Sequence, residues 1–143
     1  MAERNPSVWT LGLTIIVASV IFFVVTMAFG FLTQMFLPYD MSTVAGTRPA
    51  TDPLMMAFLL YPLIYMVGAV ILYPLLNLKW STIEKGTAYG FILWLITSVP
   101  EAFVIFTSMD NYPTGFYIDK VLFGLIAWIA TGIIIASMLK ARN

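Results

Sequence analysis

The stretch that decides the fold is Gly86–Met109, which reads GTAYGFILWLITSVPEAFVIFTSM. It is long and apolar enough to cross a lipid bilayer, because a transmembrane helix needs about 20 mostly apolar residues. It nevertheless carries one acid, Glu101, directly after Pro100. A charged group at membrane depth is costly, and its default interpretation is a functional site that faces a bundle interior or a water-filled cavity. Glu101 is therefore the first candidate functional residue.

The composition of the whole chain requires a lipid environment. Of its 143 residues, 61% are hydrophobic and 10% are charged, whereas soluble domains have about 25% charged and about 45–50% apolar residues. A soluble domain of this size has too little interior to bury so much apolar surface. We therefore expect an integral membrane protein whose first partner is the lipid bilayer.

Charge and residue usage exclude several functions. The formal net charge is zero, so a nucleic-acid partner is not expected. Cysteine and histidine are both absent, which excludes thiolate zinc sites, iron–sulfur clusters and histidine-bound haem or copper. A serine nucleophile would lack its histidine base, and a single carboxylate is too little for a metal site. We expect no catalytic residue, no metal and no cofactor.

Four apolar runs, separated by short polar links, predict four transmembrane helices at about 8–36, 54–78, 86–108 and 118–139. Asp52 followed by Pro53 is typical of a helix start, and Ser81 with Glu84 fits a capping box. Pro62 and Pro74 predict kinks in the second helix. Because the links are short, the simplest fold is an all-α, up-down-up-down four-helix bundle that forms a single domain over residues 1–143.

The orientation follows from the basic residues. Cytoplasmic links of membrane proteins carry an excess of Lys and Arg. Five of the seven lie at the N-terminus, in the link between the second and third helices, or at the C-terminus, and the two others, Arg48 and Lys120, lie on the opposite side. We therefore predict that both termini are cytoplasmic.

Small residues predict how the helices pack. In lipid, helices associate by close packing at small residues and by hydrogen bonds. Gly86 and Gly90 share one face of the third helix, and the fourth helix has Gly124, Gly132 and Ala136 at multiples of four residues. We expect these stripes to face one another, and the simplest interpretation is that they are packing seams with no further role.

Glu101 lies on the same face of the third helix as its small residues, so we expect it to point toward other helices. By depth alone, several polar groups could be its hydrogen-bond partners, and Lys120 or Arg48 could reach it as a counter-charge. The candidate intramembrane polar site comprises Glu101, Pro100, Ser98, Tyr61, Tyr65, Gln34 and Thr33. A structural role for Glu101, as a neutral or hydrogen-bonded group beside Pro100, is an equally valid interpretation.

Three functions fit these observations. The first choice is a non-catalytic accessory or structural subunit of a larger membrane complex, which packs against other membrane subunits or itself. The alternative is a small homo-oligomeric transporter that couples protons or cations through Glu101. A further alternative is a module that binds lipid or another hydrophobic ligand, because the nine methionines provide adaptable apolar surface.

Overall fold

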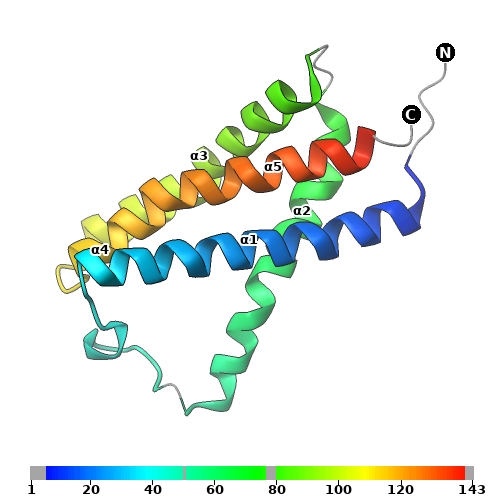
Figure 1. Cartoon of the computed structure of the whole chain (residues 1–143). Coiled ribbons are helices and arrows are strands. Elements are labelled where there is room, and N and C mark those ends of the chain that lie inside the picture. Colours follow the sequence, from blue (N-terminus) through cyan, green and yellow to red (C-terminus); the bar gives the residue numbers. More distant parts are fainter. Residues whose placement is uncertain (1–5, 50, 77–79, 141–143) are drawn as a thin grey trace.

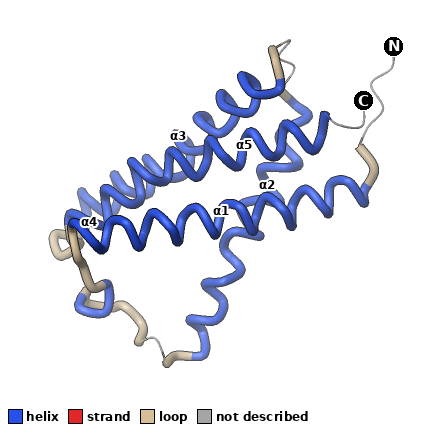
Figure 2. Tube along the Cα trace, viewed as in Figure 1, coloured by secondary structure: helices blue, strands red, loops and turns tan. Residues whose placement is uncertain are grey.

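The computed structural model describes residues 6–49, 51–76 and 80–140. It contains four helical segments that are long and apolar enough to cross a membrane: Val8–Phe36, Pro53–Leu75, Thr82–Ser108 and Thr114–Leu139. They pack together as an all-helical bundle (Figure 1), and Figure 2 shows only helices and connecting loops in the described part of the chain, the longest loop joining α1 to the second span. The predicted fold class, a polytopic four-helix membrane protein, is confirmed.

The first span is one continuous helix, α1 (Val8–Phe36). Ser7 caps its start, because the Ser7 hydroxyl accepts a hydrogen bond of 3.2 Å from the backbone N–H of Thr10. Inside the helix, the hydroxyl of Thr14 donates to the carbonyl of Thr10 at 2.7 Å, and Ser19 and Thr26 make the same kind of bond. Such bonds let polar side chains enter lipid without unpaired donors.

The second span is divided into three segments at its prolines. A 3-10 segment, η2 (Pro53–Leu60), leads into α2 (Tyr61–Leu72), and a 3-10 turn, η3 (Tyr73–Leu75), follows. Pro62 and Pro74 stand at the two junctions, where each lacks a backbone N–H for helical bonding. Figure 1 shows this span crossing α1 obliquely, with its Pro53 end pointing away from the other helices. The predicted end of the span at residue 78 lies outside the described residues.

The third span is α3 (Thr82–Ser108). Its predicted capping box is confirmed: the Ser81 N–H donates to the Glu84 carboxylate at 3.0 Å, and the Glu84 N–H donates to the Ser81 hydroxyl at 3.3 Å. The helix therefore begins four residues before the predicted start at Gly86. It continues through Pro100, which lies on an exposed face near its other end.

The fourth span begins earlier than predicted and is irregular. A short helix, α4 (Thr114–Tyr117), is followed by a π-helical segment, η4 (Ile118–Phe123), and then by α5 (Gly124–Lys140). The predicted start near Ile118 is therefore wrong by one turn. As a result Asp119 and Lys120 lie inside the span, about 8 Å from its first residue at 1.5 Å per residue.

Helices α3 and α5 approach closely at three glycines, and these two helices share the most extensive contact in the bundle. A Cβ atom on Gly86 would lie 2.6 Å from Ile133 Cα, and one on Gly132 would lie 2.7 Å from the backbone nitrogen of Gly90. Real Cβ atoms essentially never come closer than 3.0 Å to a heavy atom of another, non-adjacent residue. Only glycine therefore fits at these positions. Ala136, of the same predicted stripe, is fully buried in the core.

The core lies between α1, α2, α3 and α5. Its largest fully buried side chains include Trp128, Met66 and Ile135. Tyr89 of α3 is buried and donates its phenol hydrogen to the carbonyl of Ala69 in α2. This hydrogen bond connects the oblique second span to the α3–α5 pair.

Candidate functional site

A cavity of about 840 Å³ occupies one end of the bundle. All four spans line it, together with the loop 37–52 and Tyr112 of the link 109–113, so we call this end of the bundle the loop end. Among the lining residues of α1, α2 and α5, those farthest along the helix from the loop end are Phe22, Tyr65 and Trp128. Beyond these three residues, in the direction of the two chain termini, buried side chains such as Ala18 and Met66 fill the bundle.

Glu101 lines this cavity and forms an ion pair there. The ammonium Nζ of Lys120 lies 2.8 Å from the Glu101 carboxylate oxygen Oε1. The Lys120 side chain is 30% exposed and the Glu101 side chain is 40% exposed. Because both line the cavity, their exposed charges face the cavity and need not contact lipid. The predicted counter-charge is thus Lys120, which reaches Glu101 from the neighbouring span.

Asp119 is the second acid of the cavity, and its partners are neutral. The phenol of Tyr39 donates to Oδ2 of Asp119 at 3.2 Å. The hydroxyl of Thr33 lies 3.5 Å from Oδ1 of Asp119, but it also lies 3.0 Å from the backbone carbonyl of Phe29. Because a hydroxyl has one hydrogen to donate, the shorter bond to Phe29 leaves Tyr39 as the main donor to Asp119.

Aromatic rings form a continuous wall along the cavity. Phe22 of α1 lies 4.7 Å from Trp128 of α5, measured between ring centroids. Tyr65 of α2 packs edge-on against Trp128 at 5.6 Å and against Tyr61 at 6.1 Å. Phe58 of η2 extends the wall toward the loop end, with its ring 4.8 Å from Tyr61. We call these five residues the aromatic wall.

The residues of the predicted polar site are separated by the fold. Tyr61, Tyr65 and Ser98 line the same cavity as Glu101. The hydroxyl of Ser98 accepts a hydrogen bond of 3.2 Å from the indole of Trp128. Pro100, next to Glu101 in sequence, lies on the exposed side of α3.

The two predicted members from α1 bond to other groups. Thr33 lies beside Asp119, as described above. The side-chain amide of Gln34 donates to the backbone carbonyl of Tyr39 at 2.8 Å and accepts from its N–H at 3.1 Å. Gln34 therefore positions Tyr39, which in turn contacts Asp119.

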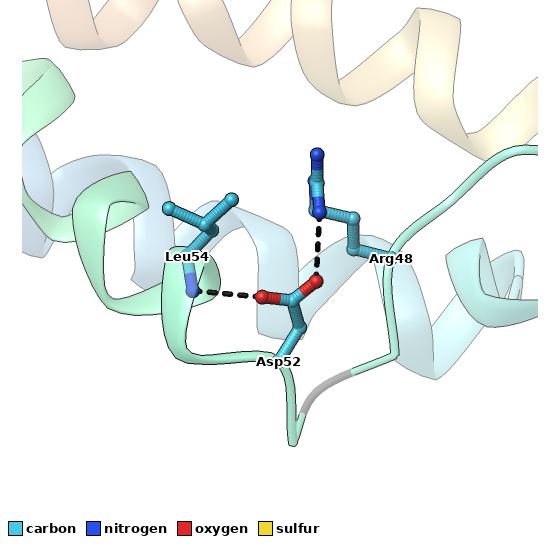
Figure 3. A network of polar contacts seen from close by, with 3 residues as sticks. All are labelled: Arg48, Asp52 and Leu54. Atoms are coloured by element: carbon cyan, nitrogen blue, oxygen red, sulfur yellow. Dashed lines mark hydrogen bonds and ion pairs between the residues drawn. The ribbon is translucent and has the colours of Figure 1, made fainter.

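Arg48, the other predicted counter-charge, pairs with Asp52 instead of Glu101. Its guanidinium lies 2.8 Å from Oδ2 of Asp52, and Oδ1 of Asp52 accepts from the Leu54 N–H at 2.9 Å (Figure 3). Both bonds lower the pKa of Asp52 below its usual value, and the bond with Arg48 has the larger effect. The Asp52–Pro53 helix start predicted from the sequence is confirmed. Arg48 pairs with the capping residue of that helix.

Tyr39 lies outside the spans and is electrostatically perturbed. Burial, and secondarily the nearby charge of Asp119 and its hydrogen bond, raise the pKa of Tyr39 to about 12. The phenol thus stays protonated and remains a hydrogen-bond donor over the physiological pH range.

Asp119 was not among the candidate residues predicted from the sequence, because the predicted fourth helix begins at about 118 and leaves Asp119 at the end of the span. A signal was present, because Thr114 is a residue type that is favoured at helix starts. A helix that starts there places Asp119 and Lys120 more than one turn inside the span. Within the described ranges, no group of three or more acidic residues lies close enough together to hold a metal ion.

Comparison with known proteins adds no relative: no family model, curated protein or solved structure matches the chain.

Proposed function

We propose that the protein binds a small amphipathic molecule inside the membrane, in the cavity at the loop end. This is the ligand-binding alternative from the sequence. The observation that carries it is a cavity of about 840 Å³ whose lining contains both aromatic side chains and the Glu101–Lys120 ion pair. Small-molecule sites commonly have volumes of about 300–1,000 Å³, mostly apolar walls and a few convergent polar groups.

The way the cavity is built supports binding of a molecule with an apolar body. The segment η2 lies on one side of it, and none of the described residues of η2 is buried. Met55 and Phe58 of η2 and Ile64 of α2 line the cavity, so the prolines that divide the second span leave room between that span and the others. The charged residues of the lining, Glu101, Asp119 and Lys120, come from the third and fourth spans.

The experiment compares wild type with a filled cavity. Thr97 of α3 lines the cavity, and its hydroxyl bonds only to the Leu93 carbonyl of its own helix among the described contacts. Thr97→Trp should place an indole ring in the cavity and block ligand retention there. Ile96→Trp is the matched control, because Ile96 is exposed on the outer face of the same helix.

Each variant is purified in a mild detergent, and the retained molecules are identified by native mass spectrometry. We expect one amphipathic molecule to remain on wild type and on Ile96→Trp and to be lost from Thr97→Trp. Retention of that molecule by Thr97→Trp at the wild-type level, with an unchanged melting temperature, would exclude the cavity as its site.

The first choice from the sequence, an accessory subunit, remains a prediction. Its test is co-purification of unrelated membrane chains. A glycine such as Gly132 is unsuitable for that test, because its contacts lie within the chain between α3 and α5. Exposed apolar residues on the outer faces, such as Ile92 and Phe103 of α3, are the appropriate positions to enlarge.

The transporter alternative also remains a prediction, and the cavity provides one feature it would need, an acid at membrane depth. A transporter must open its site to both sides of the membrane in turn. The packed core beyond Trp128 and the glycine contacts of α3 with α5 favour a site that opens only at the loop end. We therefore place binding ahead of transport.

A further inference from the structure

We infer that the cavity selects an organic monocation with an apolar body, and that Asp119 is its counter-ion. The inference rests on the proposed function, since it assigns a ligand class to the same cavity. It is carried by two independent features of the described residues: the balance of formal charges that line the cavity, and the aromatic wall beside them.

The charge balance of the cavity is negative. Three residues that line it are formally charged: Glu101, Asp119 and Lys120. Lys120 is paired with Glu101 at 2.8 Å, so each neutralises the other. With both acids ionised, the lining carries one excess negative charge, and that charge resides at Asp119.

Asp119 has capacity for a cationic partner. A carboxylate offers about four acceptor positions, and the main donor to Asp119 is the single phenol of Tyr39 at 3.2 Å. Lys120 is next to Asp119 in the sequence, but the ammonium of Lys120 lies at hydrogen-bond distance from Glu101. A negative charge in low dielectric without a paired cation is unfavourable, so a bound cation would stabilise it.

The aromatic wall favours the same sign of charge. The faces of aromatic rings carry negative electrostatic potential, and cations bind over them, most strongly over Trp and Tyr. The wall contributes Trp128, Tyr61 and Tyr65 to the cavity, together with Phe22 and Phe58. The same rings provide apolar contact for the body of the ligand.

An anionic ligand is disfavoured by the ion pair itself. The only basic residue among the described cavity-lining residues is Lys120. To bind an anion, Lys120 would have to leave Glu101, and the Glu101 carboxylate would then lack its partner at membrane depth. Breaking one side of a partly buried pair is costly, whereas a cation binds at Asp119 without disturbing it.

The test uses two ions of equal size and shape and opposite charge, tetraphenylphosphonium and tetraphenylborate. Binding of each to the detergent-solubilised protein is measured by equilibrium dialysis. Cavity binding is defined as the part that Thr97→Trp removes and Ile96→Trp retains. We expect cavity binding of tetraphenylphosphonium and at least about tenfold weaker cavity binding of tetraphenylborate.

Charge variants then assign the counter-ion. Asp119→Asn and Glu101→Gln each bring the lining to neutrality and should weaken tetraphenylphosphonium binding by about tenfold or more. Lys120→Met makes the lining more negative and should strengthen tetraphenylphosphonium binding. Asp119→Glu should restore most of the affinity, and Asp52→Asn, an acid outside the cavity, should leave it unchanged.

The outcomes separate the two proposals. If neither ion shows binding that Thr97→Trp removes, the proposed function fails and this inference fails with it. If cavity binding is found but is equal for the two ions, or stronger for tetraphenylborate, the proposed function stands and the inference is overturned. Unchanged tetraphenylphosphonium binding in a folded Asp119→Asn variant also overturns the assignment of Asp119.

The cation could belong to a soluble molecule or to the choline headgroup of a lipid. Tetraphenylphosphonium binding is therefore repeated with added dioleoylphosphatidylcholine or dioleoylphosphatidylglycerol. Competition by the choline lipid alone supports the cation site and identifies a lipid headgroup as its occupant. Absence of competition by either lipid, with tetraphenylphosphonium still bound, supports the cation site with a soluble occupant.

Discussion

Single side chains in this protein are placed by their partners as much as by their position in the sequence. Glu101 and Asp119 are both acids at membrane depth, yet one pairs with an ammonium group and the other accepts from neutral hydroxyl groups. Tyr39 comes from a loop and still reaches the cavity, because Gln34 holds both polar groups of its backbone. Pairing of this kind decides which of the acids is available to a ligand.

The titration of Tyr39 tests this arrangement. Its pKa is raised to about 12 from an ordinary value of 10.0. A raised pKa means that the contribution of Tyr39 to stability is complete below about pH 10 and is lost as the pH rises through about 12. Absorbance of tyrosinate near 295 nm, as the difference between wild type and Tyr39→Phe, gives its curve.

Asp119→Asn should shift that midpoint downward without bringing it to 10, because burial, the larger cause, remains. A midpoint near 10 in the wild-type protein would contradict the described environment of Tyr39.

A second prediction concerns the buried phenol of Tyr89. Tyr89→Phe removes the donor to the Ala69 carbonyl, which keeps the backbone bond from Tyr73. Because that acceptor is not left unpaired, we expect a loss of about 1 kcal/mol in the free energy of unfolding. Thermal unfolding in detergent measures it. Tyr73→Phe is the control, since the Tyr73 hydroxyl makes no hydrogen bond within the described part of the chain, and an equal loss there would refute the assignment.

At the level of helices, the capped helix starts could be predicted from local sequence more reliably than the type of helix within a span. Capping residues acted as local chemistry requires: Ser81 with Glu84 and Asp52 with Pro53 begin their helices as predicted. The helical form within a span was less predictable. The η2 segment is a 3-10 helix of eight residues, although its sequence is as apolar as an ordinary membrane helix, and η4 is a π-helix that carries Asp119 and Lys120.

The α3–α5 contact leads to a prediction about glycine. Gly132→Ala would place a methyl group 2.7 Å from the backbone nitrogen of Gly90, and backbone atoms cannot move aside cheaply. We expect a loss of about 2 kcal/mol or more in stability, as overpacking typically causes. The melting temperature in detergent should fall markedly.

Gly68→Ala is the matched control for this variant. A Cβ atom there meets no atom within 4 Å, and alanine favours helix over glycine by up to about 1 kcal/mol. Its melting temperature should be unchanged or slightly higher. If both variants behaved alike, the glycines would not form the close contact.

At the level of the whole molecule, the oblique second span decides where the bundle is open (Figure 1). Helix α5 packs against both α3 and α1, and α2 of the second span packs mainly against α1. Met66 and Ala69 are the residues by which the second span enters the core. Its Pro53 end diverges, and the cavity lies between that end and the other helices. The protein thus has a filled half toward its termini and a hollow half at the loop end.

The orientation of this hollow half in the membrane is a prediction from the basic residues. The chain has no cysteine, so single cysteines can be labelled without background. Ser42→Cys, in the loop 37–52, should react with a membrane-impermeant maleimide on intact cells. Ser81→Cys, at the start of α3, should react only after lysis. The reverse pattern would place the termini, and the closed half, outside.

Much of the architecture was predictable because its causes are local. Four apolar runs, their caps and the prolines of the second span all follow from residue types at short spacing. The candidate site was predicted only in part: Glu101 was identified and Lys120 was one of its two candidate counter-charges, but Asp119 was not among the candidate residues. A shift of one helical turn in the start of the fourth span is enough to change that assignment, and apolar content alone does not locate helix starts so finely.

The sequence by itself determined that this protein lies in lipid and crosses it four times, because no other environment accommodates so much apolar surface in so short a chain. Only the tertiary structure decided which polar groups meet. Glu101 and Lys120 come from different spans, and Tyr39 and Asp119 lie 80 positions apart. Their proximity depends on how the helices rotate and cross, which is set by close packing at glycines such as Gly90 and Gly132 and by the divergence of the second span.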